Sequence, residues 1–124
     1  MVELTQLARI IDIEYHGIVA GASQIYHDKI RAHLSDGSFI YIWFSRKIRG
    51  RFSYHWERRH LDGTIYRHDN FPDPRWKAIS TFPKHFHDGS QTQVRESSVD
   101  DNPVEGLRQF MDFVRKRILN PAHR

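Results

Sequence analysis

The chain has 124 residues, a hydrophobic fraction of 39%, an aromatic fraction of 13% and a formal net charge of +4. Disordered chains have few aromatic residues, and this length suits one compact unit, so we predict a single domain over residues 1–124. The absence of cysteine excludes disulfides and thiolate catalysis. We expect a cytoplasmic protein without a membrane segment. No apolar run approaches the roughly 20 residues of a transmembrane helix, and the first residues lack the pattern of a signal peptide.

The first two thirds of the chain predict one helix followed by four strands. Apolar residues recur at helical spacing over residues 3–11, which predicts a short N-terminal helix. Alternating or continuous apolar patterns predict strands over residues 24–34, 38–45, 51–58 and 64–70, and the second of these is expected to be buried on both faces. Turn residues separate the strands, at Asp36-Gly37, at residues 46–50 and at Asp62-Gly63. Hairpin connections of this kind favour an antiparallel meander.

The last third of the chain predicts irregular structure and then a long helix. Prolines 72 and 74 end the strand pattern, and we expect a helical turn at 76–79, a short edge strand at 85–88 and a loop at 89–98. Asn102 is a good N-cap, and Glu105 stands where a capping box needs an acid. An apolar stripe follows at helical spacing: Val104, Leu107, Phe110, Met111, Val114 and Ile118. We therefore predict an α+β fold, in which an antiparallel meander sheet of four to five strands is packed by this C-terminal amphipathic helix and the short N-terminal helix.

Positive charge is concentrated between residues 46 and 60. This segment holds six basic residues and one acid, Glu57, for a net charge of +5, so the rest of the chain nets −1. The six are Arg46, Lys47, Arg49, Arg51, Arg58 and Arg59. Local basicity attracts phosphate backbones, so we predict that these residues, together with Lys84, bind nucleic acid. The alternative is ordinary solvated charge around a hairpin.

Five of the nine histidines lie between residues 54 and 87. Histidine is the side chain whose charge changes nearest neutral pH, so a cluster of it suggests acid–base chemistry. We predict five catalytic residues: His55, Arg67, Asp69, His85 and His87. His55 and either His85 or His87 would form the acid–base pair of RNA cleavage. Arg67 and Lys84 would hold the phosphate, and Asp69 would orient a histidine. The alternative is that these are surface or network histidines without chemistry.

Two further hypotheses remain open. His85 and His87, at i and i+2 on a strand, point to the same side and would suit a metal ion, with His55 or Asp69 as a third ligand. A lone His-x-His is a weak signal, so we assign no metal ligand and no cofactor. The other hypothesis is a non-enzymatic module that binds nucleic acid or an acidic partner through its basic residues and aromatic side chains. An enzyme would lose activity on His55→Ala or His87→Ala while still folding, whereas a binding module would weaken with added salt.

Several short motifs resemble the TumE family of proposed toxins from bacterial and archaeal toxin–antitoxin pairs. They are Tyr54-His55-Trp56, Asp62-Gly63, Arg67 with Asp69-Asn70, and Phe82-Pro83 followed by His85 and His87, and the resemblance spans roughly residues 25–118. The chain departs from the family pattern at Glu57, His68 and Lys84, where the family often has Gln, Trp and His.

The resemblance implies the toxin component of a prokaryotic toxin–antitoxin pair, whose cognate antitoxin carries a helix-turn-helix DNA-binding domain. Combined with the chemistry of the five residues, it leads us to expect a protein that acts on RNA, as a ribonuclease or another nucleic-acid-modifying enzyme. We expect the antitoxin to cover the basic cleft with an acidic segment. An exposed strand edge would also allow a homodimer.

Overall fold

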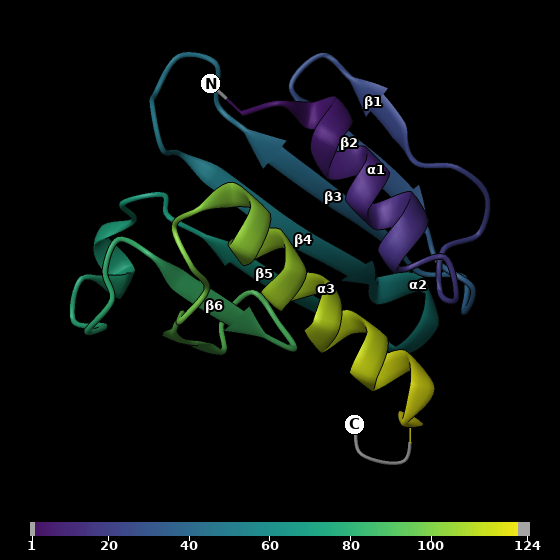
Figure 1. Cartoon of the computed structure of the whole chain (residues 1–124). Coiled ribbons are helices and arrows are strands. Elements are labelled where there is room, and N and C mark those ends of the chain that lie inside the picture. Colours follow the sequence, from purple (N-terminus) through teal and green to yellow (C-terminus); the bar gives the residue numbers. More distant parts are fainter. Residues whose placement is uncertain (1, 122–124) are drawn as a thin grey trace.

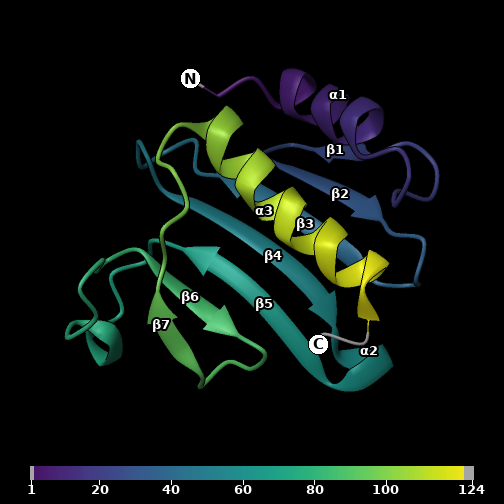
Figure 2. The ribbon, with the colours of Figure 1, turned by 60° about the horizontal axis from the view of Figure 1, so that its bottom comes forward.

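A seven-stranded antiparallel sheet with two helices on one face forms the fold, as seen in a computed structural model that describes residues 2–121 (Figure 1). The strands are β1 (Gln24–Tyr26), β2 (Lys29–His33), β3 (Phe39–Phe44), β4 (Phe52–Arg58), β5 (Thr64–Asp69), β6 (His85–Asp88) and β7 (Val94–Glu96). The helices are α1 (Leu4–Glu14), α2 (Arg59–Asp62), the 3-10 helix η1 (Pro74–Trp76) and α3 (Pro103–Leu119). Strand order in the sheet follows the chain from β1 to β7, so the predicted α+β class and the predicted meander are confirmed (Figure 2).

The predicted number of four to five strands is wrong, because the sheet gains one strand at each end. Residues 24–34 form a hairpin of β1 and β2 in place of one strand, and Ile25 pairs with Ile30. The chain reverses at His27, whose φ of 49° lies in the left-handed region that few non-glycine residues adopt. Asp28 follows in the turn, and its carboxylate accepts a hydrogen bond from the indole of Trp43 at 2.7 Å.

The extra strand at the other end is β7, which lies inside the predicted loop 89–98. Its residues are half-buried or exposed, so the sequence there lacks the apolar alternation that predicts a strand. Because β7 pairs with β6, residues 85–88 are not an edge strand as predicted, and His85 and His87 lie between two neighbouring strands.

The core lies between the sheet and the two long helices. Alternate residues of β2, β3 and β4 point toward the helices and are almost fully buried: Ile30, Ala32, Ile40, Ile42, Phe52, Tyr54 and Trp56. They meet the apolar stripes of α1 and α3, among them Leu7, Ile11, Leu107, Phe110 and Met111. The expectation that residues 38–45 are buried on both faces is wrong, because Phe39, Tyr41 and Trp43 keep partial exposure on the other side.

The α3 N-terminus follows the predicted cap but not the full capping box. The side chain of Asn102 accepts hydrogen bonds from the backbone N–H groups of Val104 and Glu105, at 3.0 and 3.2 Å. The N–H of Asn102 donates to the carboxylate of Asp100 at 2.7 Å, so Asp100 takes the part expected of Glu105.

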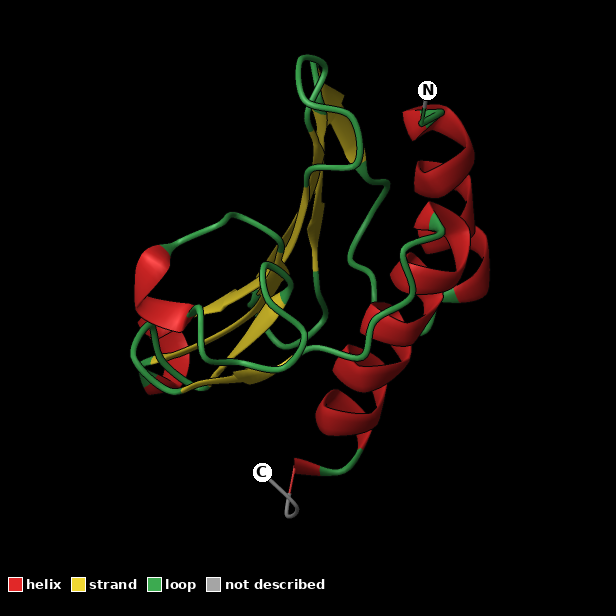
Figure 3. Cartoon of the chain, turned by 90° about the vertical axis from the view of Figure 1, so that its left-hand side faces the viewer, coloured by secondary structure: helices red, strands yellow, loops and turns green. Residues whose placement is uncertain are grey.

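Both long helices lie on the same side of the sheet, and η1 and α2 lie on the other side (Figure 3). We call the sheet surface away from α1 and α3 the open face. Within residues 2–121, no helix combines the length and the apolar character that crossing a bilayer requires. The open face is therefore where side chains of the sheet reach solvent, and the predicted site residues must be looked for there.

Candidate functional site

Strand register places all five predicted catalytic residues on the open face. His55 of β4 pairs with Arg67 of β5, which in turn pairs with His87 of β6. In the next row Asp69 of β5 pairs with His85 of β6. Residues in register on adjacent strands point to the same side, and the alternate residues of β4 and β5 pack toward the helices. Three strands thus bring together residues up to 32 positions apart in the chain.

Asp69 lies at the centre of the group. Its carboxylate oxygen Oδ2 accepts a hydrogen bond from Arg67 Nε at 3.0 Å and lies 3.6 Å from His87 Nε2. The other oxygen, Oδ1, accepts from the backbone N–H of Phe71 at 3.0 Å and lies 3.2 Å from His85 Nε2. Burial raises the pKa of Asp69, but the contacts with His87, Phe71, His85 and Arg67 outweigh it and hold the pKa below its ordinary value. Asp69 therefore carries a negative charge, and the guanidinium of Arg67 and the backbone N–H of Phe71 donate to it.

Backbone carbonyls fix the tautomers of His85 and His87. The Nδ1 atom of His85 lies 2.8 Å from the carbonyl oxygen of Pro83, and Nδ1 of His87 lies 3.0 Å from that of Gln91. A carbonyl oxygen can only accept, so both Nδ1 atoms carry hydrogen. In the neutral ring the lone pair is then on Nε2, the atom that faces Asp69.

His55 has the opposite tautomer. Its Nδ1 lies 3.3 Å from Arg67 Nη1, which can only donate, and its Nε2 lies 3.1 Å from Glu57 Oε1. Burial lowers the pKa of His55, and the charges of Arg67 and Arg59 act in the same direction against the bond to Glu57. His55 is therefore neutral at pH 7, with hydrogen on Nε2.

Glu57 continues this chain of contacts to the end of β4. Its two oxygens accept from Arg59, at 2.6 Å from Nη2 and 2.9 Å from Nε. The bonds from Arg59 are the main cause that lowers the pKa of Glu57 to about 2. Along this series of contacts the side chains are positive at Arg59, negative at Glu57, neutral at His55, positive at Arg67 and negative at Asp69.

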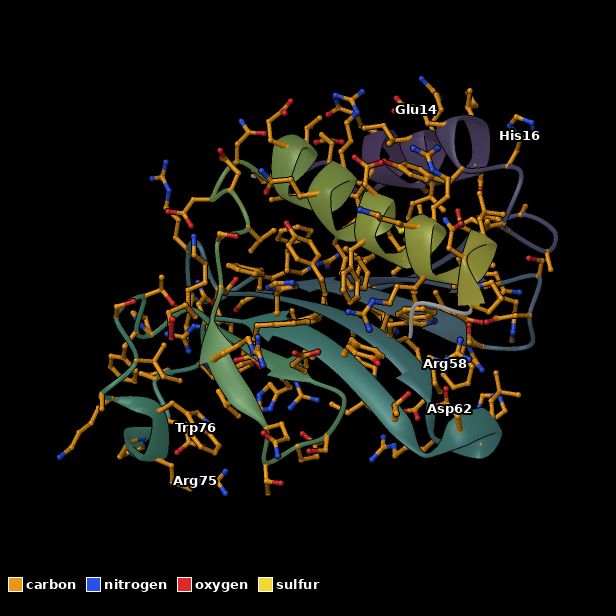
Figure 4. The ribbon with its side chains drawn as sticks, turned by 90° about the horizontal axis from the view of Figure 1, so that it is seen from below. Glu14, His16, Arg58, Asp62, Arg75 and Trp76 are labelled. Atoms are coloured by element: carbon orange, nitrogen blue, oxygen red, sulfur yellow. The ribbon has the colours of Figure 1, made fainter. Side chains whose placement is uncertain are left out.

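An open cavity of about 460 Å³ lies over the Asp69 end of this chain. Its lining combines strand residues with the segment around η1 and the β6–β7 turn: Ser53, Arg67, Asp69, Phe71, Asp73, Arg75, Trp76, His85, His87, Gln91 and Thr92. The ring of Trp76 lies 6.4 Å from that of His85 and 6.2 Å from that of His87. Arg75 and Trp76 project on the side of the sheet opposite α1 and α3 (Figure 4).

The predicted basic residues do not form one patch. Four of them, Arg46, Lys47, Arg49 and Arg51, lie in or beside the loop between β3 and β4, and the other two, Arg58 and Arg59, lie at the far end of β4. Arg58 is only 3% exposed and pairs with Asp36 and Asp62. It lies at the opposite end of the sheet from Trp76 (Figure 4). Lys84 is also away from the cavity, because its ammonium donates to the carbonyl of Val99 and to Asp101.

Three other residues near the site have roles that the sequence did not reveal. Gln91 accepts from Arg67 Nη2 at 2.6 Å and comes from a polar turn without any distinguishing pattern. Glu57 is two residues after His55 on β4 and therefore points to the same face, so its contact with His55 could have been inferred from the sequence. His68 points the other way, stacks on Phe86 at 4.3 Å and bonds Ser97, so it is half-buried on the helical side of the sheet.

The donor set of the cavity includes one group that could hold a metal ion. Asp69, His85 and His87 are all buried, and each offers a ligand atom such that the three lie within 4.8 Å of one another. Two imidazoles and a carboxylate suit zinc, manganese or a related ion.

Comparison with known proteins identifies the family of the chain. The family model described as toxin TumE matches residues 4–118, nearly the whole chain. The searches of curated proteins and of solved structures each returned no match.

Proposed function

We propose that this chain, which belongs to the TumE toxin family, is the toxin of a toxin–antitoxin pair and cleaves RNA by phosphoryl transfer at the open face. One observation carries the proposal. An arginine, a carboxylate and two histidines line a cavity on the face of the sheet opposite the two long helices, and a third histidine, His55, contacts the arginine from outside the lining. Positive charge and groups that exchange protons near pH 7 are what cleavage of a phosphodiester requires.

Arg67 is the residue that would bind the scissile phosphate. Its guanidinium is held at three N–H groups, by Asp69, His55 and Gln91. A guanidinium has five N–H groups, so within the described residues two remain for a phosphate. Arg67 lines the cavity and keeps 21% of its side-chain surface exposed, so an anion can reach it.

His55 would act as the base. Its Nδ1 lone pair points at Arg67, and it becomes available when Arg67 turns toward a phosphate. In the reaction the 2′-hydroxyl gives its proton to His55, the 2′-oxygen bonds to phosphorus, and the bond from phosphorus to the 5′-oxygen breaks. The departing 5′-oxygen would then take a proton, either from Nε2 of the imidazolium form of His85 or His87 or from water.

The rest of the open face offers a track for a single strand of RNA. Tyr41 and Phe39 are half-buried, and the guanidinium of Arg31 lies over both rings, at 5.4 and 4.7 Å. Trp43 stacks on Phe71 at 5.6 Å, at the rim of the cavity. Aromatic rings beside cations suit stacked bases and phosphates.

The same features suit an antitoxin as a partner. We propose a cognate helix-turn-helix antitoxin whose acidic segment lies on the open face, against Arg67 and the basic loop between β3 and β4. Such a segment would block both the cavity and the approach of a phosphate backbone, because like-charged ligands compete for the same cations.

Induced expression of three chains in a bacterial host tests the proposal. These are the wild type, Arg67→Ala, and Arg108→Ala as a matched control with the same change of charge on the helical face, where Arg108 pairs with Glu14. Growth, soluble protein and total RNA are measured in each culture. We expect arrest and RNA fragmentation with the wild type and the control but not with Arg67→Ala.

Each other result would count against a stated part of the proposal. Absence of arrest by a soluble wild type would remove the toxin function. Arrest with intact RNA would contradict RNA as the substrate. Equal effects of all three chains would contradict the role of Arg67 in the site.

A further inference from the structure

We propose that Asp69, His85 and His87 bind a divalent transition-metal ion, of which Zn²⁺ is the probe, at the floor of the open-face cavity. The role of the ion in phosphoryl transfer rests on the proposed function, whereas the binding itself does not. The proposal revises the sequence-based assignment, in which no residue was a metal ligand.

The hydrogen bonds of the two histidines are those of metal ligands. Both Nδ1 atoms donate to backbone carbonyls, of Pro83 and Gln91, which leaves the Nε2 atoms for the ion. Histidine ligands in metal sites almost always donate their other ring N–H to a carboxylate, a carbonyl or water, which sets the tautomer and the orientation of the ring. Asp69 is held in the same way, by the N–H of Phe71 and by Arg67.

A cation fits between the two histidines and the carboxylate. With hydrogen on Nδ1, the neutral rings turn lone pairs toward carboxylate oxygens that also carry only lone pairs, at 3.2 and 3.6 Å. A single divalent ion there would contact a ligand atom from each of the three residues.

Two separations between ligand atoms are close to those at a zinc ion. Zinc binds nitrogen and carboxylate oxygen at about 2.0–2.2 Å, so two ligand atoms at a tetrahedral ion lie roughly 3.3–3.6 Å apart. His85 Nε2 lies 3.2 Å from Asp69 Oδ1 and His87 Nε2 lies 3.6 Å from Asp69 Oδ2, so each histidine is near a different carboxylate oxygen. With one ligand atom from each residue, the three atoms lie within 4.8 Å of one another, so binding of one ion would draw them closer together. All three residues are also at most 4% exposed, so the site is built into the fold and is not a chance cluster on the surface.

The cavity above the three residues keeps room for further ligands. Catalytic zinc sites have three protein ligands and leave a position for water or substrate. Here that position would open toward Arg67, so that a phosphate could contact the ion and the guanidinium together. The ion would act as a Lewis acid: it would stabilise the departing 5′-oxygen, which then takes its proton from water.

Zinc titration of the untagged chain tests the site without RNA. After treatment with a chelator and dialysis, Zn²⁺ binding is measured by isothermal titration calorimetry for the wild type, Asp69→Asn and His87→Asn. His16→Asn is the control, because His16 is exposed on the helical side of the molecule (Figure 4). We expect one Zn²⁺ per chain for the wild type and the control. We expect affinity at least about a hundredfold weaker in the two site variants, the upper end of what residues supporting the ligands contribute.

Nitrogen NMR of the wild type gives a second readout in case a buried variant does not fold. Addition of Zn²⁺ should shift the Nε2 resonances of His85 and His87 and leave those of His55 and His16 in place. Absence of binding by the wild type, binding that Asp69→Asn leaves unchanged, or shifts at other histidines would each overturn the proposal.

The two proposals fail separately. If the chain binds zinc at these ligands but neither arrests growth nor cleaves RNA, the metal site is supported and the proposed function is contradicted. If RNA cleavage persists after the metal has been removed, the proposed function is supported and the catalytic role of the ion is contradicted.

Discussion

Arg67 and His55 face each other across β4 and β5, with 3.3 Å between Nη1 of the guanidinium and Nδ1 of the imidazole. Because a guanidinium nitrogen can only donate, this contact requires a lone pair on Nδ1 and places the hydrogen of the ring on Nε2, toward Glu57. The pair thus sets the protonation of His55 before any substrate arrives, and it joins the proposed base to the proposed phosphate-binding residue.

The first prediction concerns the tautomer of His55. Nitrogen-detected NMR of the folded chain should show a neutral ring with hydrogen on Nε2 at pH 7. Because burial and the charges of Arg67 and Arg59 lower the pKa of His55, the ring should also remain neutral below the ordinary value of about 6.5. The chain unfolded in urea is the control, in which His55 should titrate at its ordinary value. A ring already charged at pH 7 in the folded chain would contradict the assignment.

The second prediction is a stabilising role of Glu57 that acid removes. The pKa of Glu57 is about 2 in the folded chain, against an ordinary value of 4.5, so its contribution to stability is complete above pH 4.5 and is lost as the pH falls toward 2. Glu57→Gln should therefore reduce the free energy of unfolding at pH 7 by about 1–2 kcal/mol, a range that allows for solvent around Arg59. The difference from the wild type should shrink between pH 4.5 and 2.

Urea denaturation over this pH range measures the effect. Glu96→Gln, at an exposed position of β7, is the matched control and should change the free energy of unfolding by less than about 0.5 kcal/mol. A Glu57→Gln difference that stays constant down to pH 2 would show that the carboxylate charge does not contribute.

The third prediction concerns the close approach of α3 to β4 at Gly106. An added Cβ there would lie 2.6 Å from the carbonyl oxygen of Asp100 and 2.8 Å from the hydroxyl oxygen of Tyr54. Alanine normally favours a helix over glycine by about 1 kcal/mol. Here displacing a backbone carbonyl and the buried Tyr54 should outweigh that gain, so Gly106→Ala should destabilise the fold by about 1–2 kcal/mol.

Thermal unfolding compares Gly106→Ala with Gly17→Ala. An added Cβ at Gly17 has no neighbour within 4 Å, and its φ is not positive, so this control should be neutral or slightly stabilising. A higher melting temperature for Gly106→Ala than for the wild type would mean that the helix can move away from β4.

The sequence predicted those parts of the fold that depend on local patterns. The apolar stripe and Asn102 defined α3, and the alternation of Phe52, Tyr54 and Trp56 defined β4 and its buried side. The two missed strands lie at the edges of the sheet, where residues are exposed and alternation is weak. The reversal at His27 was missed because its left-handed φ has no glycine to mark it.

The sequence predicted which residues come together in the site but not the hydrogen bonds that they make. Strand parity placed His55 on the polar side of β4, and the pairing of β5 with β6 then brought Asp69 beside His85. The carbonyl bonds that fix the histidine tautomers depend on the path of the chain at Pro83 and Gln91, which no periodicity encodes. Lys84 directly precedes β6, and its ammonium donates to the carbonyl of Val99 and to Asp101 instead of a phosphate.

The last prediction follows from the separation of the basic residues into two groups. Lys47 and Arg49 are exposed in the loop between β3 and β4. Their neighbour Arg51 lies 5.3 Å above the ring of Phe71, which lines the cavity. If RNA follows the open face to the cavity, Lys47→Ala/Arg49→Ala should weaken its binding. Each lost phosphate contact should reduce the slope of log K against log salt by about 0.7, so the double variant should lose up to about 1.4.

Fluorescence anisotropy with a single-stranded RNA that is 2′-O-methylated, and so resists cleavage through the 2′-oxygen, measures these slopes over a series of KCl concentrations. Arg9→Ala/Lys116→Ala removes the same charge from exposed positions of α1 and α3 and is the matched control. An equal loss of slope in both double variants would indicate nonspecific attraction to net charge. A loss confined to Lys47→Ala/Arg49→Ala would mean that the loop guides the phosphate backbone, because the two variants carry the same net charge and differ only in where it was removed.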